Sequence, residues 1–362
     1  MRKIYTDNPI REQWNMLCKY SYEDNVERYL KKQSGGTPSQ AVLSFITESM
    51  LQAKSYYDSA ENSNLHIKPL LLYYGTVNLL VSVYCLMNGL PHGIRFHGFK
   101  IIDINSQPTR IADIKVKFEK NVRGGLHVFS SLFSEDKNLA DDSHWSLLEI
   151  LGSIPDLSED FEDSYKNELP NIIPVEIIKE KRKWLYRVDS KKLVNFKNAD
   201  DIYPLINNFN KYFLPPQIGE NYHIIRRKIF VSNDNLGIFS ITGRMNFALN
   251  HNKNVPRFPS LIILYLAGLY ALGTISRYNP EVWNKFIKKD ITGERHVIEK
   301  FLNLCFRHVP MLTLETILSE RICFLNEIEG VIDRSAQLSK EEIEEIVIRK
   351  MKEIEINKRL RT

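Results

Sequence analysis

Apolar and polar positions follow different periods in different parts of the chain. Over residues 1–155 and 256–362 apolar side chains recur mostly every three or four positions, the spacing of helices with one buried face. Between them, residues 156–255 contain short runs in which apolar and polar positions alternate, as in strands. We therefore predict a helical N-terminal part, a small strand-rich insertion and a helical C-terminal part that packs on the N-terminal helices.

Two long uncharged stretches, residues 69–94 and 258–276, are predicted to form a pair of buried central helices. Each approaches the roughly 20 residues that a helix needs to cross a bilayer. Both also contain hydroxyl and amide side chains, so we expect them to pack on each other inside a soluble protein. Gly75 suggests that the two backbones approach closely, with Gly268 or Gly273 as its partner.

Alternating runs predict the strands, and turn residues separate them. The predicted strands cover residues 113–119, 172–178, 184–188, 223–231 and 238–245. Residues 199–213 are predicted to be helical, so the insertion should combine one helix with a small, largely antiparallel sheet. The fold class predicted for the whole chain is α+β and predominantly helical.

Further helices are predicted where capping and stop signals bound an apolar stripe. Thr37 is the predicted cap of a helix over residues 39–60, with Pro38 at its first position. The remaining predicted helices cover residues 126–133, 144–152, 297–306, 312–328 and 339–360. The last of these is highly charged, and we expect a solvated helix there, with an oligomerisation seam as the alternative.

Net charge, cysteine spacing and the first residues indicate which ligands and which cellular compartment to expect. The formal net charge is +5, from 49 basic and 44 acidic residues, which is too small an excess to imply nucleic-acid binding. The four cysteines form no CxxC pair, so we expect free thiols in a reducing compartment and no zinc site: Cys18, Cys85, Cys305 and Cys323. The first residues are polar and do not resemble a signal peptide, so we expect a cytoplasmic protein.

Several segments together resemble the YaaC-like family of bacterial proteins. They are KPLLLYYGTVNLLVSVYCL, HGIRFHGF, RGGLHVFSSLF, LLGSIPDL, YLAGLYALGTISRYNPEVW and VPMLTL. The most specific piece is SRYNPEVW, where a leucine-rich helix ends in an arginine–tyrosine pair followed by a proline and a tryptophan. The resemblance implies a soluble, helix-rich fold. It supplies no established activity and no catalytic residues to carry over.

A basic loop region over residues 92–127 is the first candidate site. It contains Arg95, His97, Arg123 and His127, together with glycines that allow backbone N–H groups to approach a ligand. Arginine forks match phosphate geometry, so the region could bind an anion. The alternative is structural, with the histidines bonded to helix ends and the arginines on the surface. No metal site is expected here, because the spacing lacks a matching carboxylate.

The second candidate site is the end of the last uncharged helix, where Arg277, Tyr278 and Trp283 follow one another closely. Arginine and aromatic side chains are enriched in binding hot spots, so these residues could form a ligand- or partner-binding corner. In the structural alternative, Arg277 complements the helix dipole and the two aromatic rings pack on the helix.

A catalytic candidate is the pair Arg244 and His251. An arginine and a histidine separated by four to six residues are the signature of HEPN-type helical ribonucleases, in which histidine moves a proton and arginine stabilises the phosphorane charge. A match of this kind is expected by chance in this chain. The segment also begins as a predicted strand. Phosphate-binding loops, dinucleotide-binding motifs, hydrolase elbows and zinc-protease motifs are absent from the sequence.

These patterns favour a binding, regulatory or interaction component of a multi-protein system, of which phage defence is one example. The expected partner is a protein or a second copy of the chain, with an anionic ligand or RNA as other occupants, and no cofactor or membrane. The alternative is a metal-independent ribonuclease or phosphotransfer enzyme that uses histidine and arginine.

Overall fold

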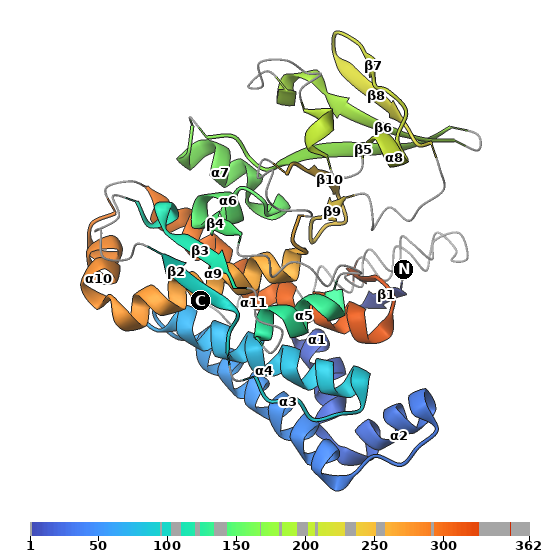
Figure 1. Cartoon of the computed structure of the whole chain (residues 1–362), viewed down its shortest axis with the longest axis vertical. Coiled ribbons are helices and arrows are strands. Elements are labelled where there is room, and N and C mark those ends of the chain that lie inside the picture. The colour runs from blue at the N-terminus through green and yellow to red at the C-terminus, as the bar shows by residue number, and fades with distance from the viewer. Residues whose placement is uncertain are drawn as a thin grey trace.

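The computed structural model describes residues 2–94, 96–102, 110–119, 124–133, 143–166, 168–180, 183–193, 202–206, 209–228, 237–250, 258–290, 293–325 and 348. The fold is α+β and predominantly helical, with small antiparallel sheets, as predicted. Two separate hydrophobic cores are present. The larger belongs to a helical body, and the smaller lies within the insertion, between Ile173 and Leu249 (Figure 1).

The helical body is built from both ends of the chain. Its helices are α1 (Pro9–Leu17), α2 (Glu23–Ser34), α3 (Gln40–Glu61), α4 (Lys68–Asn88), α5 (Gly125–Phe133), α6 (Leu147–Leu151), α7 (Ser158–Ser164), α9 (Leu261–Tyr278), α10 (Pro280–Lys288) and α11 (Glu294–Leu318). Short 3-10 helices cover Cys18–Ser21, Ile111–Asp113, Pro155–Leu157, Ser190–Leu193 and Tyr203–Leu205. Helices from the two predicted helical parts therefore share one core.

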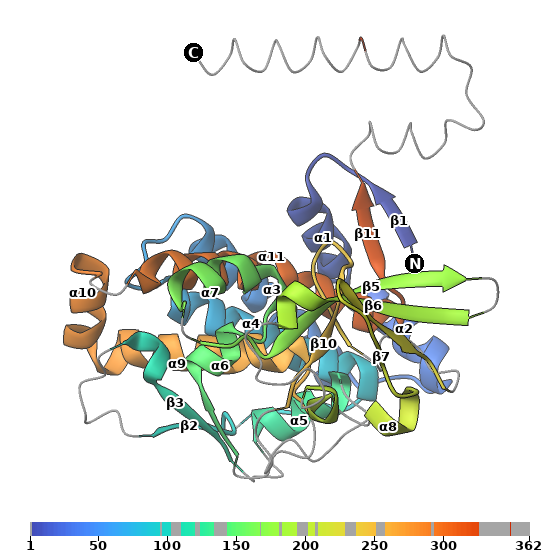
Figure 2. The same ribbon diagram turned by 90° about the horizontal axis from the view of Figure 1, so that it is seen from above.

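The centre of the body is α9, which packs on α4 as the two uncharged stretches predicted. The two helices are antiparallel, since Gly273 near the end of α9 lies beside Pro69 at the start of α4. Seen from above, α4, α9 and α11 cross the same part of the body (Figure 2). By length and composition both uncharged helices could span a membrane. However, 61% of the 18-residue apolar segment of α4 and 72% of that of α9 are buried within the protein.

The predicted glycine-to-glycine contact is wrong for Gly75. A methyl group at Gly75 would lie 2.8 Å from the Tyr57 ring of α3, so this glycine makes room for an aromatic side chain. Gly268 similarly faces the ring of Phe301 in α11. Between α4 and α9, the glycine that lies against the backbone of the other helix is Gly273 of α9, beside Pro69 and Leu70. Small residues here accommodate large rings as well as close backbones.

The insertion is a six-stranded, fully antiparallel sheet in the order β7–β8–β6–β5–β10–β9. Its strands are β5 (Ile172–Glu180), β6 (Lys183–Asp189), β7 (Gln217–Ile218), β8 (Tyr222–Arg226), β9 (Ile238–Phe239) and β10 (Met245–Ala248). Within the range 199–213, where a helix was predicted, the described residues 202–206 and 209–213 form the 3-10 helix at Tyr203–Leu205, a bridge at Ile206 and α8 (Phe209–Tyr212). Phe209 and Phe213 of this segment are buried in the core of the insertion.

A three-stranded antiparallel sheet covers part of α9. It consists of β2 (Phe99–Ile102), the predicted strand β3 (Lys115–Phe118) and β4 (His144–Ser146). The helix predicted over residues 144–152 is therefore correct only in its second half. Ser146 ends β4 and caps α6 in a capping box with Glu149, because its side chain accepts the N–H of Glu149 at 3.1 Å.

Three other predicted helix boundaries change. The cap of α3 is Ser39, and not Thr37, since the Ser39 hydroxyl accepts the Val42 N–H. In the C-terminal part α11 continues through Pro310, where a break was predicted, because Val309 and Pro310 are both buried by tertiary packing. The chain then forms β11 (Ile322–Leu325), which pairs in parallel with β1 (Arg2–Tyr5). The predicted charged helix over 339–360 lies outside the described residues except for residue 348.

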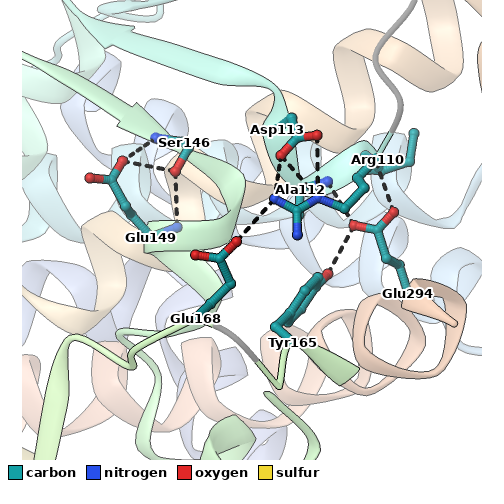
Figure 3. A network of polar contacts seen from close by, with 9 residues as sticks. Arg110, Ala112, Asp113, Ser146, Glu149, Tyr165, Glu168 and Glu294 are labelled. Carbon is teal, nitrogen blue, oxygen red and sulfur yellow. Dashed lines mark hydrogen bonds and ion pairs between the residues drawn. The ribbon is translucent and has the colours of Figure 1, made fainter. Parts of the chain in front are cut away.

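A buried carboxylate fastens the loop before β3 to the start of α11 (Figure 3). Glu294 is 1% exposed and accepts the backbone N–H groups of Ile111 at 3.0 Å and Ala112 at 2.9 Å. The Tyr165 hydroxyl donates a third hydrogen bond to it at 3.0 Å. Beside this cluster Arg110 donates to Asp113 and Glu168. The three-stranded sheet is thereby held in a fixed position over the body.

Candidate functional site

Two of the predicted site residues form the exposed end of α9. Arg277 and Tyr278 are both exposed, Tyr278 by 64%. The Arg277 guanidinium lies over the Tyr278 ring, with 4.9 Å from Cζ to the ring centroid, and its Nη1 donates to the Tyr74 hydroxyl at 2.8 Å. Within the described part of the chain Arg277 makes no ion pair with a carboxylate. The guanidinium is thus oriented by two aromatic residues while its charge is not neutralised.

Helical spacing places this arginine beside a group of tyrosines. Tyr270, Thr274 and Arg277 are three and four residues apart and therefore share one face of α9. The Tyr270 ring packs edge-on against Tyr73 of α4, with 5.7 Å between centroids, and Tyr73 in turn contacts Tyr74 at 5.5 Å. The antiparallel packing of α4 and α9 brings these tyrosines together.

His97, a predicted site residue from the basic loop region, joins the same group. Its Nδ1 lies 2.6 Å from the Tyr73 hydroxyl, and its ring contacts Tyr270 at 5.8 Å between centroids. Desolvation lowers the pKa of His97 and raises the pKa of Tyr73, so this hydrogen bond joins a protonated phenol and a neutral imidazole. His97 consequently adds hydrogen-bonding capacity to the site and no positive charge at neutral pH.

We define the tyrosine–arginine patch as Tyr74, His97, Tyr270, Arg277 and Tyr278. It draws on α4, on the loop before β2 and on α9. Charges of both signs lie near the patch. Burial raises the pKa of Tyr270, and the negative charge of Glu119, the residue after β3, raises it further. Arg277 supplies the positive end of the patch and Glu119 borders the other end.

The backbone of the loop around His97 is tied to the start of α5. The Gly125 N–H donates to the Phe96 carbonyl at 2.7 Å, and the Leu126 N–H donates to the His97 carbonyl at 3.1 Å. Gly98 adopts a φ of +79°, and a methyl group there would lie 2.7 Å from the Leu126 side chain. These two N–H groups are therefore already bonded and do not serve as the anion-binding donors that the glycine-rich sequence suggested.

Of the other residues predicted for the two binding sites, the structure describes His127 and Trp283, and neither belongs to the patch. Arg95 and Arg123 lie outside the described residues. His127 is half-buried in the first turn of α5. Trp283 is only 1% exposed, and its indole donates to the Leu65 carbonyl at 3.2 Å, so it anchors α10 to the body and is not part of a binding surface.

In the ribonuclease-like pair of Arg244 and His251, the arginine does not lie on a helix. Arg244 is exposed in the turn before β10, and residues Met245–Ala248 form that strand. The helix that the HEPN signature needs is absent from this part of the described chain. His251 lies outside the described residues.

Arg277, Tyr278 and His97 were predicted from the sequence, but the tyrosines that contact them were not. These tyrosines lie inside the two uncharged stretches, where an aromatic residue is expected to belong to the core: Tyr73, Tyr74 and Tyr270. One usable signal was available, because Tyr270 lies seven residues before Arg277, on the same helical face. The partner helix that supplies Tyr74 could only be assigned from the tertiary packing.

Comparison with known proteins gives one match. A family model described as YaaC-like Protein matches residues 13–317. This range includes every residue of the patch and ends near the C-terminus of α11. No curated protein and no solved structure matches the chain.

Proposed function

The chain belongs to the YaaC-like family, and we propose that it is a binding component of a multi-protein system, in which the tyrosine–arginine patch holds an acidic segment of a partner protein. One observation carries the proposal. Arg277 is exposed, oriented by the Tyr74 hydroxyl and the Tyr278 ring, and without a carboxylate partner among the described residues.

Preorganisation makes such an arginine suitable for binding. A free arginine loses about 0.5–1.5 kcal/mol of side-chain entropy when an interface immobilises it, and contacts already present in the unbound protein reduce that cost. The planar guanidinium matches a carboxylate or phosphate in a bidentate manner. Tyr278 beside it offers a large rigid ring with a polar tip, the kind of side chain that contributes strongly at the centre of interfaces.

The chemistry of the patch favours an acidic protein segment over RNA. A nucleic-acid backbone is held by several cations, each neutralising one phosphate. The patch provides one guanidinium, since His97 is neutral and Glu119 is nearby. A single well-placed carboxylate or phosphate on a protein loop fits this charge. We keep the expectation of a cytoplasmic bacterial protein, with phage defence as one system in which such a component would act.

The enzymatic alternative has less support. A metal-independent ribonuclease would need a histidine and an arginine that face one substrate phosphate. His97 and Arg277 share the patch, but the His97 Nδ1 is committed to Tyr73 and partial burial keeps its pKa low. A test with total RNA in EDTA addresses this alternative directly: cleavage lost in both His97→Ala and Arg277→Ala would favour the enzyme over the binding component.

Photo-cross-linking at the patch tests the binding proposal. A photoreactive phenylalanine analogue replaces Tyr278 in cells of the native host, and the matched control places it at Tyr22, which is 66% exposed and outside the patch. We expect position 278 to cross-link to an acidic segment of one protein, with the product lost when Arg277→Gln is added. Cross-linking that is equal at both positions, or that is unaffected by Arg277→Gln, would overturn the proposal.

A further inference from the structure

The start of α9 opens into a cleft between the helical body and the insertion. The cleft has a volume of about 1360 Å³. Its walls come from α1, the first turn of α9, the second half of α11 and β11 on one side, and from β9 with the turn that leads to β10 on the other. Figure 1 shows β9 and β10 on the side of the insertion that is nearest the body. The tyrosine–arginine patch is at the last turn of α9, about 25 Å away for a helix of this length, so the cleft is a separate site.

The first turn of α9 is not capped by any of the described residues. Ser260 occupies the N-cap position, but its side chain forms no capping hydrogen bond, and its Oγ is buried without a partner. The first helical N–H groups that do form bonds are those of Ile263 and Leu264, which donate to the Ser260 carbonyl at 3.0 and 3.1 Å. Those of Leu261 and Ile262 form no hydrogen bond within the described chain. Ser260, Leu261 and Ile262 all line the cleft.

These donors need an acceptor, and the helix indicates the charge that it should carry. Leu261 and Ile262 are both buried, so bulk water does not surround their backbone. A buried helix end without partners is rare in native proteins. The peptide dipoles of this 18-residue helix also place a partial positive charge at its first turn. A negatively charged oxygen meets both requirements.

A second unsatisfied group, on another helix, points to a ligand in the same cleft. Gln13 of α1 lines the cleft and is 4% exposed, and its Oε1 has no hydrogen-bond partner in the part of the chain that the structure describes. A side-chain amide that is this deeply buried normally has a partner. Because Gln13 and Ser260 come from different elements, the packing of one helix does not explain both.

The remaining lining is suited to an uncharged, apolar body. It includes several large apolar side chains: Phe133, Phe258, Met311, Leu312 and Phe324. The charged residues of the lining are two arginines and two glutamates, whose formal charges sum to zero: Arg307, Arg321, Glu315 and Glu320. Sites for small molecules typically combine apolar walls with a few polar groups that fix orientation, and they often lie at boundaries between structural units.

We propose that the cleft binds a small organic anion, an apolar molecule that carries one carboxylate or phosphate group. The charged oxygens accept the N–H groups of Leu261 and Ile262 and the hydroxyl of Ser260. The apolar body lies against the phenylalanines of the walls, and a polar substituent bonds the Gln13 amide. A carboxylate and a phosphate offer the same charged oxygens, so two probes are needed to distinguish them. The site shares no residue with the patch and does not depend on the function proposed there.

Thermal unfolding of the full chain with phenyl phosphate and with benzoate tests the proposal. The two probes share an aromatic ring and differ in the anionic group. At constant ionic strength, we expect at least one of them to raise the melting temperature with the logarithm of its concentration, by about 2 °C at ten times its dissociation constant. The larger rise identifies the preferred group, a phosphate ester or a carboxylic acid. No rise with either probe would overturn the proposal.

Ser260→Asp places a carboxylate at the N-cap position of α9, where it accepts the same N–H groups as the ligand. We expect this variant to melt at a higher temperature than the wild type without a probe, and to lose most of the response to the preferred probe. The matched control is Ser39→Asp at the N-cap of α3, where the serine hydroxyl already accepts the Val42 N–H. The control should keep the full response. Equal responses of the two variants would contradict the proposal.

Two milder variants test the individual groups. Ser260→Ala removes one donor to a charged oxygen and should weaken the preferred probe by about tenfold. Gln13→Met has a similar shape without the amide, and it should raise the melting temperature of the unliganded protein because no buried oxygen is left unsatisfied. An unchanged affinity in Ser260→Ala would exclude the start of α9 as the anion site, and a lower melting temperature in Gln13→Met would refute the role of Gln13.

Discussion

Replacing Glu294 by alanine removes the carboxylate that fastens the loop before β3 to α11. The side chain accepts three hydrogen bonds at 2.9–3.0 Å, two from backbone N–H groups and one from Tyr165. The substitution leaves the two N–H groups of Ile111 and Ala112 buried without acceptors, at about 1–3 kcal/mol each. The burial that raises the pKa of Tyr165 keeps its phenol protonated, so it also loses its acceptor.

We therefore expect Glu294→Ala to lower the free energy of unfolding by about 3–5 kcal/mol, and Tyr165→Phe, which removes one of the three donors, by about 1.5–3 kcal/mol. Thermal unfolding measures the total effect, and amide hydrogen exchange localises it. Exchange should accelerate at Ile111, Ala112 and β3, while β5 in the insertion keeps its protection. Unchanged protection at Ile111 and Ala112 in Glu294→Ala would show that the carboxylate does not hold this segment in place.

Two further predictions concern backbone strain and pH. Gly98→Ala should destabilise the protein by about 1–3 kcal/mol because of its positive φ and the contact at 2.7 Å, whereas Gly93→Ala, where nothing lies within 4 Å, should be nearly neutral in the same thermal unfolding assay. His308 has a folded pKa of about 3, set by burial, Arg321 and Arg307, against 6.5 when unfolded, so protonation of the unfolded state should lower stability by at most about 2 kcal/mol from pH 7.5 to pH 5. Denaturant unfolding at both pH values should show this loss in the wild type and not in His308→Gln; an equal pH dependence in both proteins would contradict it.

The sequence predicted the central features of the fold because the signals were local and strong. An uncharged stretch of helical length had to be buried, so the pairing of α4 with α9 followed from composition. Alternation identified β3, β5 and β6 for the same reason. Predictions were wrong where tertiary packing overrides a local signal. Pro310 is an example: a proline normally ends a helix, but here it lies inside α11 and is buried against the core.

The site was partly predictable for a related reason. Arg277 and Tyr278 stand out because a charge abruptly ends an apolar helix. Their connection to His97 runs through Tyr73 and Tyr270, and depends on which faces of α4 and α9 meet. A cleft that Gln13 and His308 both line was not predicted, because these two residues are far apart in the chain and lie within ordinary helical patterns. Sites assembled across elements carry little signal in any one segment.

The role proposed for Arg277 is to bind an acidic segment of a partner protein. The most direct measurement is the affinity of the protein for the segment that cross-links at position 278, compared between wild type, Arg277→Gln and Arg28→Gln. Arg28 is the control because it is exposed and also bonds to neutral oxygens, those of the Asp24 carbonyl and the Asn25 amide. We predict that Arg277→Gln weakens binding by about tenfold or more, as loss of a charge-assisted bond does, and that Arg28→Gln has no effect. Equal affinities of the wild type and Arg277→Gln would contradict this role.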